Sequence, residues 1–228
     1  MTDFADSRNF YQTPRGRETQ DLLRAQLGRL CPCFFGGRVL PLGCADLLLG
    51  SINAVSGRMT AATGETFSCL VDSKNKPLPD ADIDCVVALH SAKEISDMDF
   101  LLREIWRVLK GEGRLLLIVP RRRSAWADNP DTPFGNEQAY SVPQIKKILK
   151  AQGFSVMRVR SALYAPPGNT DGSFPFAYGI EKIGPLVPFC HGGVLVISAR
   201  KRVYGLSGEK KRKSRECADP LLPLPLPI

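Results

Sequence analysis

The sequence contains no apolar run that is long enough to cross a membrane. Its longest aliphatic stretches, such as Leu115 to Val119, have the length of a strand, whereas a transmembrane helix needs about 20 apolar residues. Aspartates stand at positions 3 and 6, where a secretory signal peptide has a basic and then an apolar segment. We therefore expect a cytosolic protein with no membrane span.

Histidine is scarce, and the cysteines are not spaced as metal ligands. The only histidines are His90 and His191, and a single residue separates Cys31 from Cys33, whereas zinc knuckles and redox pairs have two. The seven cysteines are odd in number, and some, such as Cys85, lie in apolar runs where a reduced thiol behaves as a small hydrophobe. We expect no metal site and no disulfide framework.

Apolar residues are abundant, and the charge is unevenly distributed. Hydrophobic residues make up 43% of the 228 positions, which is enough for the core of one domain and excludes wholesale disorder. The net charge is +8, yet residues 200–228 hold eight basic and only three acidic side chains, so the rest is nearly balanced. The basic run 210–213 fits phosphate binding and fits a solvated tail as well.

Helical and strand-like patterns alternate along the chain, which is typical of an α/β protein. Residues 83–89 form a continuous apolar run, as in strands that are buried within a parallel sheet. The spacing of apolar residues predicts helices over 18–30, 46–55, 97–110 and 141–152, and strands over 38–42, 66–71, 83–89, 115–119, 154–163 and 194–203.

Residues 77–120 contain a pattern that we recognise. Leu78-Pro79-Asp80-Ala81-Asp82 precedes the apolar run, His90 follows it, and Glu104 to Gly113 (EIWRVLKGEG) precedes the next strand. This arrangement resembles the class I S-adenosylmethionine-dependent methyltransferases, and within them the branch typified by quinone-biosynthesis C-methyltransferases. The resemblance implies a three-layer Rossmann-like fold, with a mostly parallel seven-stranded sheet (possibly reduced) whose last strand is antiparallel.

The same resemblance suggests how the chain is organised and what it does. It implies an N-terminal lid-like segment (1–17), a methyltransferase-like domain (18–204) and a basic, then Pro/Leu-rich tail (205–228) that we expect to be disordered. The implied activity is the transfer of a methyl group from S-adenosyl-L-methionine to an acceptor that the sequence does not identify.

In this fold the cofactor lies at the carboxyl ends of the strands. The alignment implies five cofactor contacts: Gly43, Cys44, Asp72, Leu89 and His90. The first motif departs from the family pattern, because Ala45 stands in place of its second glycine and Pro41 in place of its acidic residue. Asn53 is an uncharged substitute for the acid that binds the ribose hydroxyls, and these departures predict a weakened cofactor site.

His90 is the candidate catalytic residue, because an imidazole there could take a proton from the acceptor. The alternative is that His90 only lines the cofactor pocket. For acceptor binding we expect Tyr11, Arg121 and Trp126. The loop that begins at Arg121 and continues through residues 131–135 either holds a phosphate and stacks a base, or is solvated with Trp126 in the core.

Three functions follow from these observations. The first is a methyltransferase, a transferase of unknown acceptor. The second is a catalytically inactive methyltransferase fold that serves in binding or assembly, favoured by the altered first motif. The third is an RNA-modifying methyltransferase that uses the basic tail. A nicotinamide dehydrogenase is disfavoured, because the three-glycine fingerprint is missing.

Overall fold

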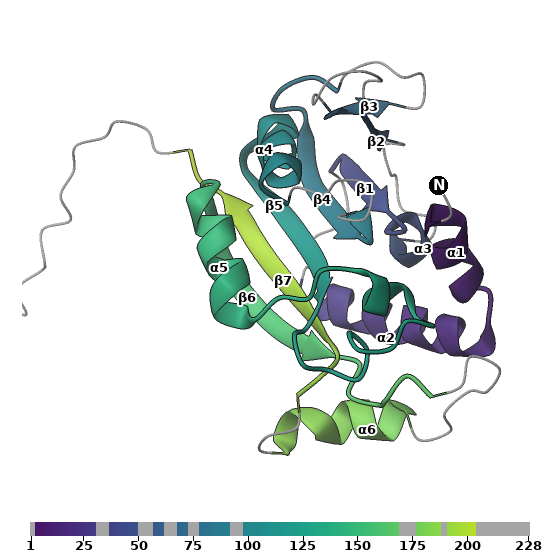
Figure 1. Cartoon of the computed structure of the whole chain (residues 1–228). Coiled ribbons are helices and arrows are strands. Elements are labelled where there is room, and N and C mark those ends of the chain that lie inside the picture. Colours follow the sequence, from purple (N-terminus) through teal and green to yellow (C-terminus); the bar gives the residue numbers. More distant parts are fainter. Residues whose placement is uncertain are drawn as a thin grey trace, which may run out of the picture.

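The computed structural model describes residues 3–30, 37–49, 57–61, 68–72, 78–91, 98–168, 177–187 and 191–203 (Figure 1). Its elements, in chain order, are α1 (Asp3–Phe10), α2 (Pro14–Leu30), β1 (Val39–Gly43), α3 (Asp46–Leu49), β2 (Gly57–Ala61), β3 (Ser68–Asp72), β4 (Ile83–Leu89), α4 (Met98–Val108), β5 (Leu109–Pro120), the 3-10 helix η2 (Pro133–Asn136), α5 (Val142–Ala151), β6 (Phe154–Ala162), α6 (Ala177–Ile183), the 3-10 helix η3 (Gly184–Leu186) and β7 (Val194–Lys201).

The main sheet has five strands in the order β1-β4-β5-β7-β6. β1, β4 and β5 are parallel to one another, and β7 is antiparallel to both of its neighbours, β5 and β6. This arrangement confirms the α/β class and the antiparallel last strand.

β2 and β3 form an antiparallel pair of their own, which differs from the seven-stranded sheet that the resemblance implies. Six residues separate the two strands along the chain. A parallel connection needs a crossover of a dozen or more residues, so this short link allows only antiparallel pairing.

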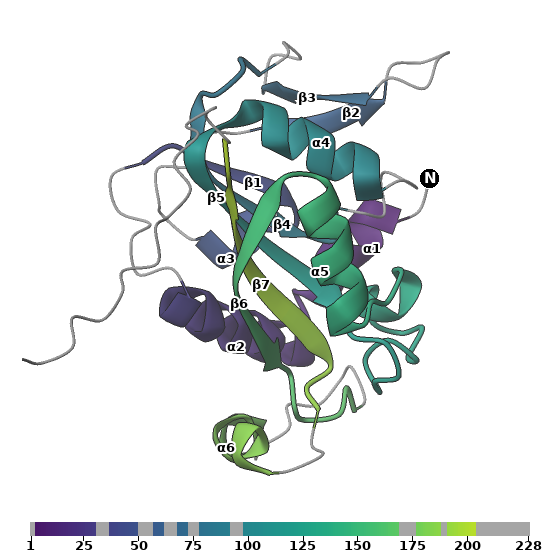
Figure 2. The same cartoon turned by 90° about the vertical axis from the view of Figure 1, so that its left-hand side faces the viewer.

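Helices cover both faces of the main sheet (Figure 2). Alternate residues of a strand point to opposite faces, and β4 accordingly places Val87 in the apolar cluster that holds the buried leucines of α2 and α3. Its neighbour Val86 lies in the cluster on the other face, with α4 and α5. The result is the three-layer architecture that the resemblance implies.

The helices and strands with strong local signals lie close to their predicted bounds. In α4, Leu101, Leu102 and Ile105 are fully buried, and α5 begins with the predicted cap, in which the Ser141 hydroxyl accepts from the Gln144 N–H at 3.4 Å. β5 begins earlier than predicted, because Leu109 pairs with Ile83 of β4 ahead of a register shift.

Two predictions reach beyond the described residues. The predicted helix over 46–55 is described as α3 only as far as Leu49, and the tail expected to be disordered (205–228) lies outside the described part. The proposed domain division stays a prediction. Among the residues that the structure describes, no helix is long and apolar enough to span a bilayer.

Asp84 joins three segments at the amino end of the sheet. Its carboxylate accepts from the backbone N–H of Arg38 at 2.9 Å and from the Lys110 ammonium at 2.8 Å. The Lys110 hydrogen bond is the main reason why the pKa of this carboxyl lies below its usual 3.8.

Arg107 has a similar structural role at the same end of the sheet. It donates to the Glu104 carboxylate, to the carbonyl of Leu78 at 2.8 Å and to Asp80. Arg107 thereby ties α4 to the turn before β4.

We expect Asp84→Asn to lower the free energy of unfolding at pH 7 by about 1 kcal/mol, a modest value because the carboxylate is partly exposed. Since the folded-state pKa is lowered, the carboxylate contributes fully above its usual pKa and loses that contribution as the pH falls through the lowered value. The difference between wild type and variant in urea unfolding should therefore shrink below about pH 4. Asp128→Asn, at an exposed position, is the control, and an equal loss there would contradict this assignment.

Candidate functional site

Gly43 ends β1 in a conformation that only glycine adopts readily. Its φ is +64°, and a Cβ atom there would lie 2.0 Å from the carbonyl oxygen of Leu89. The next residue, Cys44, donates its backbone N–H to the same oxygen at 2.8 Å. The carboxyl ends of β1 and β4 are thus joined, and the predicted contacts Gly43, Cys44, Leu89 and His90 lie together.

His90 follows β4 directly and is buried, with two hydrogen-bond partners. Its Nε2 lies 2.8 Å from the Tyr11 hydroxyl, and its Nδ1 contacts the Glu137 carboxylate. A carboxylate only accepts, so these partners assign the proton to Nδ1 and leave Nε2 to accept from the phenol. The backbone φ of His90 is +56°, which is uncommon for a residue other than glycine. Backbone strain of this kind is concentrated at functional sites.

Aromatic rings enclose the imidazole. The ring of Phe134, at the start of η2, lies 4.6 Å from that of His90, and the Trp126 ring meets Phe134 edge-on at 5.8 Å. The Trp126 indole N–H donates to the carbonyl of Ala165 at 2.8 Å, and the residue is 2% exposed. Of the two alternatives for this loop, the structure therefore shows Trp126 in the core, with no open ring face on which a base could stack.

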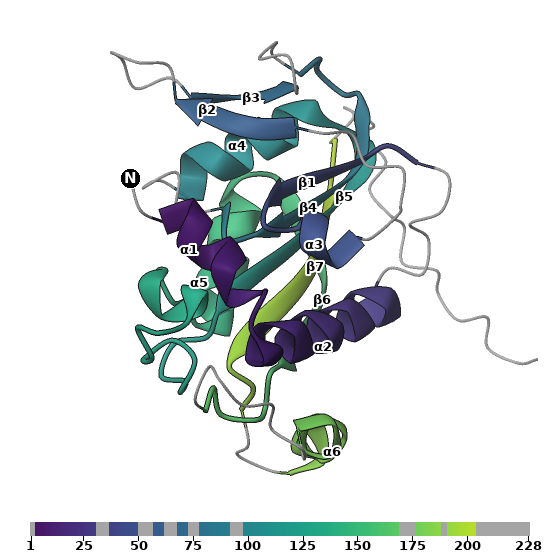
Figure 3. The ribbon, with the colours of Figure 1, turned by 90° about the vertical axis from the view of Figure 1, so that its right-hand side faces the viewer.

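The N-terminal segment crosses the end of the sheet at which β1 and β4 terminate, and covers it (Figure 3). Arg8 pairs with Asp46 of α3 at 2.7 Å, which fixes α1 beside the glycine turn. Arg15 pairs with Glu18 at 2.8 Å within α2, and its guanidinium lies 5.3 Å from the centre of the Trp126 ring. These contacts hold Tyr11, between α1 and α2, over His90.

Burial sets the protonation state of Tyr11. Desolvation raises the pKa of its phenol well above the usual value of 10.0, and the nearby Cys44 and Glu137 act in the same direction. The phenol therefore stays protonated at neutral pH and donates to His90 Nε2.

The remaining predicted site residues lie elsewhere. Arg121 donates to the Ser161 hydroxyl of β6 at 3.0 Å, and its hydrogen bond is therefore not with His90 or the residues that contact it. Asp72 ends β3 in the separate two-stranded sheet, and Asn53 lies outside the described residues. Whether Asp72 and Arg121 bind cofactor or acceptor stays a prediction.

Glu137 is the site residue that the sequence did not reveal. It is 47 positions from His90 and follows a loop without local periodicity. In the described segments no three His, Cys, Asp or Glu side chains lie close enough together to hold a metal ion.

We expect long-range ¹H–¹⁵N spectra to show His90 protonated at Nδ1 and not at Nε2, with exposed His191 as the reference signal. Tyr11→Phe should keep this tautomer and lower the free energy of unfolding by about 1–2 kcal/mol, because the buried Nε2 loses its donor. Tyr178→Phe, at a half-exposed position, should change neither. A wild-type spectrum with the proton on Nε2 would contradict the assignment.

Comparisons with known proteins agree on one family. Residues 53–117 match the family model "Methyltransferase domain". A probable S-adenosylmethionine-dependent methyltransferase of Mycobacterium tuberculosis is 25% identical over 154 residues, which cover 60% of this chain and 56% of that protein. The chain therefore matches only about half the length of this curated relative.

Solved structures share the fold. A methyltransferase from Thermotoga maritima has a TM-score of 0.52 at 16% identity, covering 80% of this chain and 89% of its own. One from Archaeoglobus fulgidus has a TM-score of 0.50 at 21% identity, covering 80% and 94%. The described part of this chain thus has the fold of these S-adenosylmethionine-dependent methyltransferases.

Proposed function

We propose that the protein is a cytosolic S-adenosylmethionine-dependent methyltransferase whose acceptor carries a protic nucleophile, a hydroxyl or an amine. The observation that carries the proposal is the joined end of β1 and β4, where the Gly43 turn meets the His90 loop. In an open α/β sheet, ligands bind in the crevice at the carboxyl ends of the strands, which is where this junction lies.

The chain's own residues can manage the proton in this reaction. The cofactor supplies a methyl group already activated on a sulfonium, so the protein needs mainly to orient the acceptor and exclude water. A cofactor bound beside Gly43 would supply this methyl group, and the acceptor's nucleophile would give up its proton on receiving it. The acceptor's proton passes to His90 Nε2, while Glu137 holds Nδ1–H and stabilises the imidazolium.

The site is closed in this structure. Cys44 and Leu89 are fully buried. The Tyr11 hydroxyl bonds to His90 Nε2 and so occupies the place that the methyl acceptor's nucleophile would take. The N-terminal segment must therefore move before a cofactor can reach Gly43. We infer that segment 1–17 is a lid, and that the acceptor's nucleophile replaces the Tyr11 hydroxyl when the lid opens.

An inactive methyltransferase fold that binds a partner is the second candidate. It is favoured by the enclosure of Cys44 and Leu89 under the protein's own side chains and by Pro41 and Ala45 in the first motif. An RNA-modifying enzyme that uses the basic tail (205–228) is a further proposal, whose support lies in the sequence alone.

Two finer points belong to this proposal. We infer that the β2–β3 pair stands for the outer strands of a seven-stranded sheet, since it directly precedes β4 in the chain. The pattern from Leu78 to Leu115 supports a relation to the quinone-biosynthesis C-methyltransferases.

Calorimetry of the full chain with S-adenosylhomocysteine tests the function. We expect saturable binding that becomes about fivefold tighter in Tyr11→Phe, because the loss of a hydrogen bond worth about 1 kcal/mol weakens the closed state. Tyr178→Phe should bind as the wild type does. Absence of heat at millimolar ligand in all three proteins would support the inactive fold instead.

A further inference from the structure

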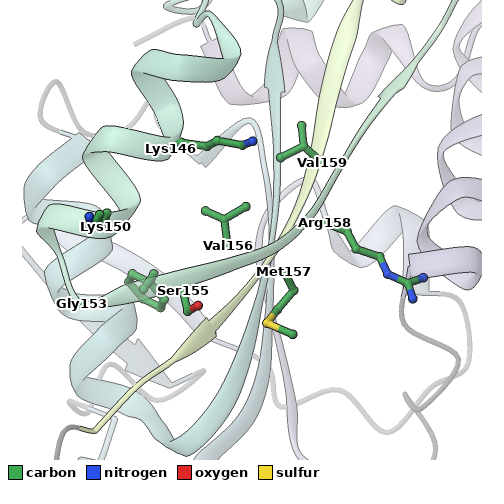
Figure 4. A pocket seen from close by; sticks show the side chains of 9 residues that line it. Lys146, Lys150, Gly153, Ser155, Val156, Met157, Arg158 and Val159 are labelled. Carbon is green, nitrogen blue, oxygen red and sulfur yellow. The ribbon is translucent and has the colours of Figure 1, made fainter. Parts of the chain in front are cut away.

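Two adjoining cavities lie at the edge of the sheet that β6 forms. One, of about 360 Å³, lies between α5 and the first half of β6 (Figure 4). The other, of about 480 Å³, lies beside Trp106 of α4 and the end of β7. Gly153 lines both cavities, so they lie next to each other around the start of β6, and we call the two together the depression.

Cationic side chains line this depression, and no carboxylate does. Those in the first cavity are Lys146, Lys150 and Arg158, and those in the second are Arg103 and Arg202. All five residues are exposed. We call this set the cationic edge. Across the described part of the chain, none of the five has a carboxylate within ion-pair distance.

The acidic residues at this end of the sheet already have partners. Asp84 pairs with Lys110 at 2.8 Å, Glu112 with Arg200 at 3.1 Å, and Asp80 with Arg107. Asp99 accepts from Gln152, which lines the second cavity, at 3.2 Å. Asp99, whose partner Gln152 is neutral, is thus one carboxylate beside the second cavity, but the five exposed cations outnumber it, which favours an anionic ligand.

A bulge in β6 lies directly before Arg158, the one cation of the set that belongs to this strand. The register with β7 shifts between Val156 and Arg158, which leaves Met157 as the extra residue, half exposed. In Figure 4, Lys146 extends from α5 toward Val159, whereas Arg158 projects from the other side of the strand. Lys146 and Arg158 thus lie on opposite sides of the edge strand.

We propose that the cationic edge binds the phosphodiester backbone of single-stranded RNA. Such a chain carries one charge per nucleotide, and its affinity comes mainly from Lys and Arg contacts with phosphates. Trp106 adds an aromatic side chain to the wall of the second cavity. The sequence continues from Val203, in that cavity, to the basic run 210–213. The inference stands independently of methyl transfer.

Two other anionic partners fit less well. A membrane surface favours an apolar belt beside its cations, whereas Met157 and Val203 are the only large apolar side chains exposed here among the described residues. Each phosphate of RNA provides one negative charge. An acidic peptide would need carboxylates at several consecutive positions to present the same density of negative charge.

The test compares two double variants that each remove two positive charges. Lys146→Gln with Lys150→Gln neutralises two residues of α5 that line the first cavity, whereas Lys147→Gln with Arg160→Gln neutralises exposed neighbours that do not line the cavities. Binding of the full chain to a fluorescein-labelled RNA of about 20 nucleotides is followed by anisotropy at increasing KCl. Thermal unfolding checks that both variants fold.

We expect the lining variant to bind about tenfold or more weakly near 0.1 M KCl, and its salt slope to fall by about 1.4, the value for two lost phosphate contacts on a single strand. The neighbouring variant should stay within about threefold of the wild type. If the lining variant fails to fold, Lys150→Gln against Lys147→Gln gives the same comparison.

Three results would overturn the proposal. Equal losses in the two double variants would mean that binding depends on diffuse charge or on the tail. Unchanged RNA affinity in the lining variant would exclude the cationic edge. Stronger binding to polyglutamate or to phosphatidylserine vesicles than to RNA would identify a different class of partner.

Discussion

The close approach of Gly43 to the carbonyl of Leu89 is the contact on which the site depends. A side chain at position 43 would collide with that oxygen, so β1 and β4 could not end side by side. Because they do, Cys44 bonds to Leu89 and the chain leaves β4 through His90 in a left-handed conformation. The imidazole is then directed toward the N-terminal segment. One glycine thereby determines where the only buried histidine of the described chain lies.

Because His90 is buried, breaking either of its hydrogen bonds is costly in free energy. Tyr11, His90 and Glu137 come from the N-terminal segment, the end of β4 and the loop after β5, and each lies in the interior. A buried polar group without a partner costs about 1–3 kcal/mol, so each of these residues stabilises the position of the other two. A ligand that separates Tyr11 from His90 must replace the lost hydrogen bond. An acceptor hydroxyl or amine can do so, which is why the closed geometry favours a protic acceptor.

Local signals predicted most of the fold, and long-range contacts explain what they missed. The apolar spacing of α4, the Ser141 cap of α5 and the apolar run of β4 each lie within a few adjacent residues, and the structure has all three. Glu137 meets His90 only through the folded sheet, so no local pattern identifies it. Trp126 illustrates the same limit. In the sequence, an aromatic residue close to three arginines is typical of a binding loop, and only the structure shows that its ring is buried. The resemblance located the glycine turn and implied a lid-like N-terminal segment, but not the hydrogen bond between Tyr11 and His90.

The covered site and the cationic edge lie at opposite ends of the sheet, which makes the two proposals separable. His90 follows the carboxyl end of β4, whereas Gly153 precedes β6, which runs in the same direction as β4. Through the register of the sheet, Phe154 at the start of β6 lies level with Asp84 of β4, so about six residues of strand, roughly 20 Å, separate that level from His90 along the strand direction. Substitutions at the two ends should then affect stability and binding independently. If RNA were also the methyl acceptor, a strand held at the start of β6 would need on the order of six stacked nucleotides to reach the level of His90. A single nucleotide bound at the start of β6 therefore does not place its own base at the imidazole, so an RNA acceptor would have to extend along the sheet from the cationic edge.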